Sequence, residues 1–489
     1  MGPFHESLIQ NNLYMRRSVF LVLAVHFFCS SSYSQDSTWS LQKCIDYGLN
    51  NNIFLEQTKL SNENNAINLK QVRANRIPTL TGSATQGFSL GRSIDPTSNQ
   101  YVTSALRTNN FSVSGSIILF NGFQNKNLIK QNTLTYEAGN LDVEAAKNNL
   151  KISIIESYYQ ILFSQEQATN ALTQIESTQG QIEKIQKQVE AGSLPELNVL
   201  QLKSTLAANK LTLVNAQNQV YLSKVTLMQL LNIPVSDNFN IEKPQESELV
   251  FDSVNRSTAK DIYEGALAIQ PSIKSLQLKK ESSFSGVRVA KGSKLPRLSL
   301  NGNLFTNYSS AKTLNSIQTQ YVQSNIGFLQ SNPSQIVSAI VPENTVIRNQ
   351  YPFFNQSKDN IGKTLSLSLS IPILNNRIAR SNIEKAIVTQ QIAELNEVSG
   401  KNDLRKIIEQ AYADMKSAEN TYFASKETLN SMELTYLNSE KRFNLGMTSP
   451  ADFLIDKNNY YSAQVNLSFA KYQYILKSKV LEFYKTNQL

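Results

Sequence analysis

Residues 365–373 decide the fold of this chain, and they read Leu-Ser-Leu-Ser-Leu-Ser-Ile-Pro-Ile. Apolar side chains occupy every second position, with Ser366, Ser368 and Ser370 between them. Successive side chains of a β-strand point to opposite faces, so the segment predicts a strand with one apolar and one small polar face. This alternation over about ten residues is typical of a transmembrane strand beside a water-filled interior.

Three more segments show the same alternation. Residues 111–119 and 298–304 set apolar residues and glycine against serine and asparagine, and residues 80–90 place threonine and serine on one face. We therefore predict four strands, over about 79–90, 110–120, 297–308 and 361–373. Aromatic residues stand near the strand ends, where the interfacial girdles of a membrane barrel lie: Phe120, Phe123, Phe305 and Tyr308.

The number of predicted strands limits the kind of barrel that one chain can form. The smallest membrane barrels have about eight strands, and open sheet edges are not tolerated in lipid. If these strands span a membrane, several copies must share one barrel, and a dimer or a trimer would serve. A soluble sandwich uses the same alternation, but four strands are few for its core. Beyond the N-terminal segment, no run of 18 apolar residues predicts a membrane-spanning helix.

The chain contains two copies of one unit. Pro78-Thr79-Leu80 recurs as Pro296-Arg297-Leu298, an offset of 218 (296 − 78). Ser112 recurs as Ser366 and Gly192 as Gly446, both at an offset of 254 (366 − 112). We predict repeats at 39–232 and 259–486, joined by a polar linker at 233–258. The difference in offset, 36 residues (254 − 218), predicts an insertion in the second repeat, which we expect to form a long loop at 309–360 facing the cell exterior.

Each repeat also predicts a helical hairpin. A first helix is expected at about 41–75 and 259–293, and long proline-free helices at about 123–189 and 376–443. Some 65 helical residues span roughly 100 Å. Glycine then proline follow each long helix, at Gly192 and Pro195 and at Gly446 and Pro450. Glycine suits a helix end and proline a helix start, so we predict hairpin tips near 192 and 446 in a coiled-coil array.

The N-terminus predicts a secretory signal peptide over residues 1–34, with Met15 as a second candidate start. A basic Met15-Arg16-Arg17 precedes an apolar run and then small residues. Its removal takes away both histidines, His5 and His26, and Cys29, which leaves Cys44 as the single cysteine. We therefore expect no catalytic residue, no metal site, no cofactor and no disulfide in the mature chain.

The formal charge of +9 is spread along the chain without a run of lysine or arginine. This distribution favours a solvated basic surface and no nucleic-acid partner.

Several motifs resemble those of the TolC-like outer membrane efflux protein family, over nearly the whole mature chain. They are the duplicated Pro-x-Leu at Pro78 and Pro296, the corner Leu119-Phe120-Asn121-Gly122, and Arg442-Phe443-Asn444-Leu445-Gly446 with Ser449-Pro450-Ala451-Asp452 after it. The resemblance implies a mixed α and β membrane protein. It would be a homotrimer with a 12-stranded barrel in outer-membrane lipid and an α-helical periplasmic tunnel.

The resemblance also implies partners and a function. A periplasmic adaptor (membrane fusion) protein and an inner-membrane transporter would complete a tripartite efflux or type I secretion system. The chain would be its passive outer-membrane channel, exporting small molecules or polypeptides, and would not be an enzyme. The cargo cannot be read from the sequence, although the absence of histidine from the mature chain argues against a dedicated copper or silver relay.

The same resemblance points to residues at the second tip. Asp452 matches a pore-facing carboxylate of the family, while Ile455 occupies the second such position and Asp456 follows it. Thr448 stands where some members have a locking arginine, and Phe443 where they have a tyrosine. Adaptor docking is expected at the tips, at Gly192, Pro195, Gly446 and Pro450.

A purely structural role for Asp452 is equally open. Ser449-Pro450-Ala451-Asp452 has the pattern of a capping box, and Ser193-Leu194-Pro195-Glu196 has a similar one. Capping and pore duty are compatible.

Two other function classes compete with the duct. One is a structural or adhesive coiled-coil protein anchored in the envelope, and the other is a carboxylate hydrolase. The duplicated pair of strands for each helical hairpin favours the duct, since a stalk needs one anchor and no repeat.

Overall fold

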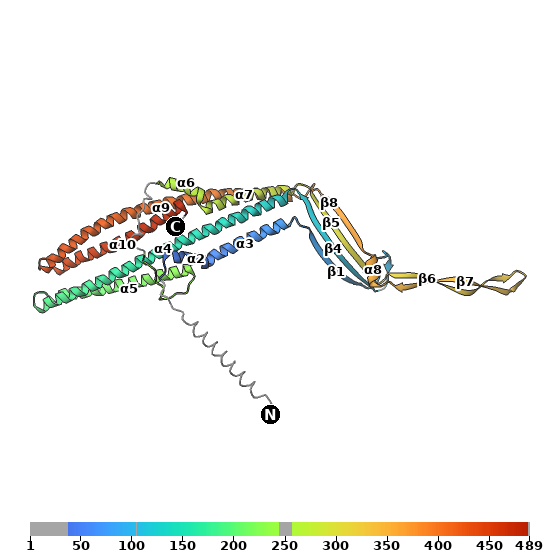
Figure 1. Ribbon diagram of the computed structural model, residues 1–489, viewed down its shortest axis with the longest axis horizontal. Helices are drawn as coiled ribbons and strands as arrows, with labels where there is room; N and C mark the ends of the chain where they lie inside the picture. Colours follow the sequence, from blue (N-terminus) through green and yellow to red (C-terminus); the bar gives the residue numbers. More distant parts are fainter. Residues whose placement is uncertain (1–37, 104, 244–256, 488–489) are drawn as a thin grey trace, which may run out of the picture. The chain divides into compact units, whose positions relative to one another are not determined.

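A computed structural model describes residues 38–103, 105–243 and 257–487 (Figure 1). These described residues divide into two compact units, one formed by residues 38–60, 141–243, 257–274 and 400–487, the other by residues 61–103, 105–140 and 275–399. The predicted signal peptide lies outside the described residues, together with His5, His26 and Cys29, and so does part of the predicted linker.

The second unit contains a four-stranded antiparallel sheet in the order β1-β4-β5-β8. Its strands are β1 (Thr79–Ser89), β4 (Leu106–Asn121), β5 (Arg297–Ser309) and β8 (Gly362–Ser370). Two strands come from each repeat, at the four places where alternation predicts them. In this sheet β1 and β8 each have one partner, so both edges are open.

The register separates polar from apolar side chains. Thr81, Ser114, Asn303 and Thr364 form one row across the four strands, and this polar face has a hollow of about 250 Å³. On the other face Leu365, Leu367 and Leu369 are 76%, 63% and 62% exposed. Such large apolar exposure along a strand is what a lipid-facing surface requires.

The strands turn into the long helices through one backbone arrangement used twice. Gly122 and Phe123 both have left-handed φ, 63° and 61°, and at an offset of 254 Asn376 and Arg377 have 50° and 63°. A Cβ at Gly122 would lie 2.4 Å from the carbonyl oxygen of Gly292, so only glycine fits there.

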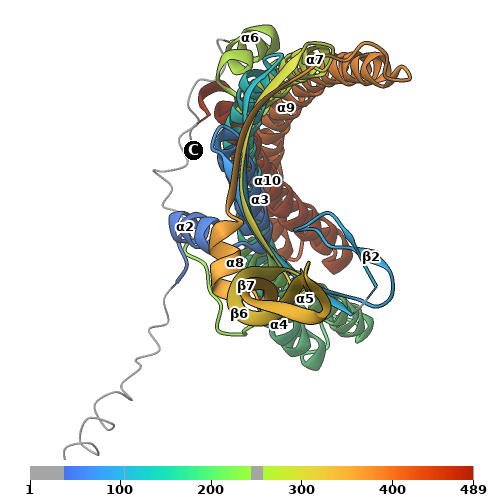
Figure 2. The same cartoon turned by 90° about the vertical axis from the view of Figure 1, so that its right-hand side faces the viewer.

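The segment predicted as a long loop is mostly regular structure, which corrects that prediction. It contains β6 (Thr313–Leu329), β7 (Asn332–Gln350) and the short α8 (Phe353–Asp359). Within the described residues, strands β6 and β7 pair only with each other, and Figure 2 shows this hairpin end-on. Apolar residues stand on both of its faces, so the sequence lacks the strict alternation that identified the other strands. The connection after β1 contains the short pair β2 (Ser93–Ile94) and β3 (Tyr101–Val102).

Each predicted first helix is broken once, at equivalent positions. The breaks separate α2 (Leu41–Asn51) from α3 (Ile53–Ala74), and α6 (Ala259–Ile269) from α7 (Pro271–Gly292). Asn52 and Gln270, which are 218 residues apart, have extended backbones with ψ of 121° and 122°. Gln270 precedes proline, which disfavours helix, and the Asn52 side chain accepts from the Leu55 amide at 3.0 Å.

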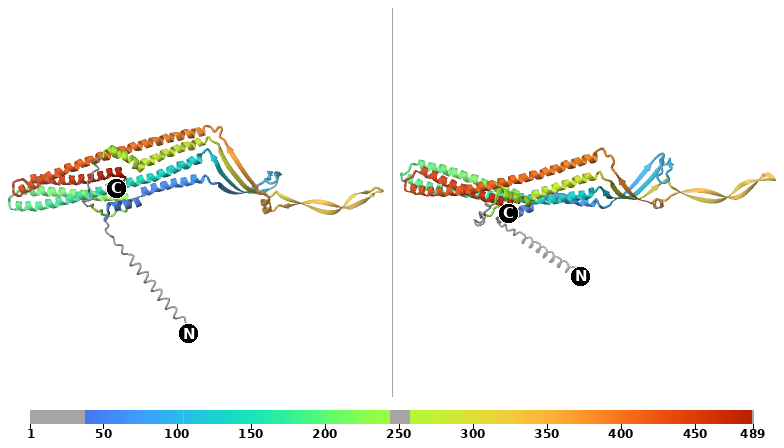
Figure 3. Two further views of the ribbon diagram at one scale, coloured as in Figure 1. Left: turned by 45° about the horizontal axis from the view of Figure 1, so that its top comes forward. Right: turned by 90° about the horizontal axis from the view of Figure 1, so that it is seen from above.

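The hairpin helices are α4 (Gln124–Glu190), α5 (Leu197–Leu231), α9 (Ile378–Asn444) and α10 (Pro450–Thr486). In both views of Figure 3, α5 lies beside α4 and α10 lies beside α9. Among the described residues, no helix combines the length and the hydrophobicity needed to cross a bilayer.

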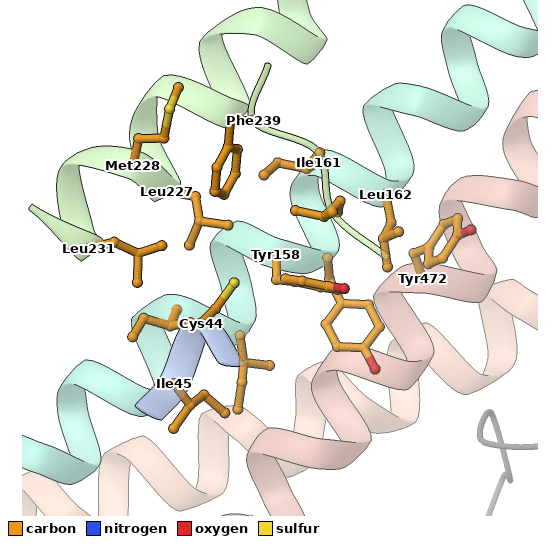
Figure 4. Close-up of a cluster of buried hydrophobic side chains, with 14 of the residues drawn as sticks. Cys44, Ile45, Tyr158, Ile161, Leu162, Leu227, Met228, Leu231, Phe239 and Tyr472 are labelled. Carbon is orange, nitrogen blue, oxygen red and sulfur yellow. The ribbon is translucent and has the colours of Figure 1, made fainter. Parts of the chain in front are cut away.

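The core of the first unit gathers helices that are distant in sequence (Figure 4). Tyr158 is 2% exposed, and its hydroxyl lies 2.6 Å from the carbonyl oxygen of Glu242. Cys44 is fully buried beside it, and this burial raises the pKa of the thiol to about 12. Phe239 and Ile241 are also buried there, so the first part of the predicted linker belongs to the core.

Candidate functional site at the hairpin tips

Both hairpin tips end their first helix in the same way. Gly192 and Gly446 have left-handed φ of 71° and 73°. The amide after each glycine reaches back five residues, from Ser193 to the Gln188 oxygen at 2.9 Å and from Met447 to the Arg442 oxygen at 2.8 Å. A left-handed glycine followed by such a backbone hydrogen bond is a Schellman motif, which satisfies carbonyl groups left free at a helix end. The duplicated glycines therefore have a structural role in both repeats.

Asp452 lies in the first turn of α10 and is exposed. Ser449 is the N-cap, and its hydroxyl oxygen accepts from the Asp452 amide at 3.1 Å. The Asp452 carboxylate accepts from the Ser449 hydroxyl at 2.7 Å. A capping box would instead direct this carboxylate to the Ser449 backbone amide, so half of the predicted box is formed. The exposed carboxylate also suits the positive end of the helix dipole.

The similar box predicted at the first tip does not form. Helix α5 begins at Leu197, its N-cap Glu196 has a helical backbone, and no side chain of the described residues caps it. The Ser193 hydroxyl turns the other way and donates to the Gln188 carbonyl oxygen at 2.7 Å. Ser193 therefore caps the end of α4 instead of the start of α5.

Phe443 is a packing residue between the tips. Its ring stacks on Phe453 with centroids 4.7 Å apart and an angle of 8° between the planes. The Lys184 ammonium lies 5.6 Å from the same ring and also donates to the Asn444 side chain. Phe443 contacts a buried cluster of Ile185, Val199 and Leu202 from the first tip, so the two tips share one small core.

The remaining predicted residues surround the start of α10. Thr448 is half-buried, and its hydroxyl has no hydrogen-bond partner among the described residues. Asp456 is half-buried and stands four positions after Asp452, so the two carboxylates occupy neighbouring places on one helix face. Pro450 is the first residue of the helix. The structure thus brings Phe443, Thr448, Asp452 and Asp456 to one tip.

Sequence reasoning missed Lys457, which lies one position after Asp456. It is 2% exposed, and its ammonium has no hydrogen-bond partner in the described part of the chain. Burial lowers its pKa to about 8, while the charge of Glu440 partly opposes this shift. The ammonium lies 5.8 Å from the Tyr461 ring, a distance that allows a cation–π attraction. Phe453, Lys457 and Tyr461 are spaced by four, which was the available signal that this lysine shares a buried stripe.

Apolar residues are exposed at both tips. Leu197 and Leu200 are 61% and 54% exposed at the first, and Leu445 and Met447 are 73% and 68% exposed at the second. Clusters of exposed apolar residues of this kind mark contact surfaces for other proteins.

Comparison with known proteins shows which family has this sequence and fold. The sequence profile of the family described as "Outer membrane efflux protein" matches residues 45–232 and 262–484, one range in each repeat. The toxin and drug export protein A of Aggregatibacter actinomycetemcomitans is 21% identical over 442 residues, 89% of this chain and 83% of its own length.

Two solved structures share the architecture. CusC, a transmembrane channel, has a TM-score of 0.72 at 16% identity and covers 93% of this chain and 95% of its own. The outer membrane protein VceC of Vibrio cholerae has a TM-score of 0.72 at 13% identity, covering 91% and 95%. The predicted combination of barrel strands with long helical hairpins is thereby confirmed as the fold of outer-membrane channels. The chain belongs to the outer membrane efflux protein family.

Proposed function

We propose that three copies of this chain form a passive duct that carries solutes across the periplasm and outer membrane. The open edges of the four-stranded sheet are the observation on which this rests. Three such sheets, joined edge to edge between β1 and β8, would make one closed barrel of 12 strands. Closure would satisfy every edge and leave no unpaired backbone in lipid.

The polar and apolar faces of the sheet indicate which side of that barrel would face its interior and which would face lipid. The row formed by Thr81, Ser114, Asn303 and Thr364 would line a water-filled interior. The exposed leucines of β8 would face the lipid chains. A barrel with this polarity conducts without a membrane-spanning helix.

The second tip supports a selective narrowing at the periplasmic end. In a trimer Asp452 and Asp456 would each be repeated three times around one axis. Rings of carboxylates at a constriction attract cations. Thr448 and Phe443 offer no charged lock, and the Phe443 side chain is engaged in packing. We therefore infer that electrostatics at Asp452 and Asp456 tune passage more than a salt-bridge latch does.

The tips also suit the docking of a periplasmic adaptor protein. Leu197, Leu200, Leu445 and Met447 expose apolar surface beside the tight turns at Gly192 and Gly446. Pro450 is the first residue of α10, and Pro195 directly precedes Glu196, the N-cap of α5. Both prolines limit the motion of the turns. An inner-membrane transporter joined through that adaptor would supply the energy.

Reconstitution in planar bilayers tests this function. The purified, signal-cleaved protein should give discrete ion conductance that favours cations. A stable assembly that inserts but never conducts would favour the envelope-anchored structural protein instead. Exchanging residues of the polar row for leucine, for example by Ser114→Leu with Asn303→Leu, should reduce the conductance of the channel.

A further inference from the structure

The β6–β7 hairpin is an isolated ribbon within the described chain. Its ladder runs from Thr313 paired with Gln350 to Leu329 paired with Asn332, and no third strand joins it. Strands of 17 and 19 residues extend roughly 55 Å. A two-stranded hairpin is at best marginally stable in water, so a ribbon of this length needs a partner.

Its side chains indicate that the partner is apolar. On one face Ile317 lies opposite Val346, and Tyr321 and Ile340 are 74% and 71% exposed. On the other face Ile347 and Leu314 are 36% and 46% exposed. Side chains of this size on both faces would otherwise stand in water without contact.

The charge of the ribbon suits association with copies of itself. Residues 313–350 contain one acidic residue, Glu343, and one basic residue, Arg348, whereas the whole chain has a formal charge of +9. Long exposed edges are normally protected from self-association by charged side chains. Here identical ribbons could approach one another with little repulsion.

The base of the ribbon lies at the boundary where protomers would meet. The ribbon leaves β5 and returns through α8 to β8, the open edge strand of the sheet. The Gln356 amide donates to the Ser309 carbonyl oxygen at 3.1 Å, and the Asn360 amide donates to that of Asn307 at 2.8 Å. The Tyr308 and Phe353 rings lie 5.1 Å apart. The root of the ribbon is thus fixed to β5, one strand in from the open edge strand β8 where the next protomer would join.

We propose that the β6–β7 hairpins of the three protomers pack against one another and form a β-structured collar at the outer end of the duct. The inference rests on the shared barrel proposed above. Self-association would bury Ile317, Tyr321 and Ile340 and complete a ribbon that one chain leaves unsupported. The other possible occupant, a different protein that adds to the free edges, is an outcome of the test.

Cysteine cross-linking tests the contact directly. The mature chain has only the buried Cys44, so an introduced cysteine gives a clean signal. Ile340→Cys, with Ile317→Cys as a second position, should yield a disulfide-linked pair of protomers on mild oxidation of the full-length trimer. Gln100→Cys, at an exposed place in the connection between β1 and β4, is the matched control. We expect several-fold more cross-linked pair from the hairpin positions than from the control.

Removal of the ribbon provides the second measurement. The Tyr351 amide donates to the Lys312 carbonyl oxygen at 3.4 Å, so two glycines can replace residues 313–350 without strain. The trimer lacking the ribbon should still form and conduct, but it should dissociate in detergent at a lower temperature.

The outcomes separate this inference from the proposed function. Cross-linking at the control level in an intact trimer would overturn the collar alone, and so would cross-linking on whole cells to a protein of different mass. Failure of both the full chain and the deletion variant to form a trimer would overturn the shared barrel as well.

Discussion

Lys203 at the first tip and Lys457 at the second occupy equivalent positions, 254 residues apart (457 − 203). Lys203 is exposed, whereas Lys457 is 2% exposed. The residues four positions before and after each lysine explain this difference in exposure. The second tip has Phe453 and Tyr461 where the first has the smaller Val199 and Ala207. The repeated backbone therefore fixes the hairpin, while side-chain size decides which tip holds a buried charge.

The largest expected effect comes from removing that charge. The pKa of Lys457 in the folded protein, about 8, lies below its ordinary 10.5. The unfolded chain therefore binds more protons between pH 8 and 10.5, and folding stability rises with pH across that window. Below pH 8 the full penalty applies, so Lys457→Met should stabilise each protomer by about 3 kcal/mol at pH 7. Thermal unfolding followed by circular dichroism measures the gain.

Two controls sharpen this prediction. Lys203→Met should leave the melting temperature nearly unchanged, because that side chain is exposed. The advantage of Lys457→Met should shrink as the pH rises from 8 to 10.5. Loss of stability in Lys457→Met would contradict the account and show that the ammonium acquires a partner in the assembly.

The shared core of the tips should give the next largest effect. Phe443→Ala removes the stack on Phe453 and part of the contact with the cluster of Ile185, Val199 and Leu202. We expect a loss of about 2 kcal/mol in the free energy of unfolding. Val189→Ala, the equivalent change at the first tip, should cost about 1 kcal/mol. Equal losses at the two positions, measured by the same melts, would mean that the stack contributes nothing.

Removing a cap should again cost more stability at the second tip than at the first, but the difference should be smaller than for Phe443 and Val189. Ser449→Ala removes the N-cap of α10 and should cost about 1 kcal/mol. Ser193→Ala removes a bond to the end of α4 and should leave the start of α5 unaffected. Amide hydrogen exchange should therefore accelerate at Asp452 and Phe453 in the first variant only. Acceleration at the start of α5 in Ser193→Ala would show that Ser193 caps both helices.

The smallest expected effect is on ion selectivity. Asp452→Asn makes the second tip resemble the first, where Asn198 is the equivalent residue. It removes a charge while keeping the Ser449 hydroxyl beside the Asp452 amide, so stability should change little. Reversal potentials in bilayers should shift toward lower cation preference. If neither Asp452→Asn nor Asn198→Asp changed the cation preference, Asp452 would have its structural role alone.

Periodic features of the sequence predicted most of the fold. The alternation at Leu365, Leu367 and Leu369 located β8, the offset of 254 relates β8 to β4, and the offset of 218 relates β5 to β1. Gly192 and Gly446 predicted both tips because a left-handed turn favours glycine. These signals are local, so the single chain was enough to read them.

The misses lie where the sequence carries a weak or an ambiguous signal. The β6–β7 ribbon has apolar residues on both faces, so its strands lack one consistent alternation. The burial of Lys457 depends on Phe453 and Tyr461 across turns of the same helix. The Ser193 hydroxyl had two backbone targets within reach, and the capping pattern could not decide between them. The pore duty of Asp452 and Asp456 remains a prediction.

The stoichiometry of the detergent-solubilised protein, measured by native mass spectrometry, tests the shared barrel most directly. Four strands with two open edges predict a complex of three identical chains that requires detergent to stay in solution. A monomer that is stable in water without detergent would contradict the shared barrel and the duct built on it.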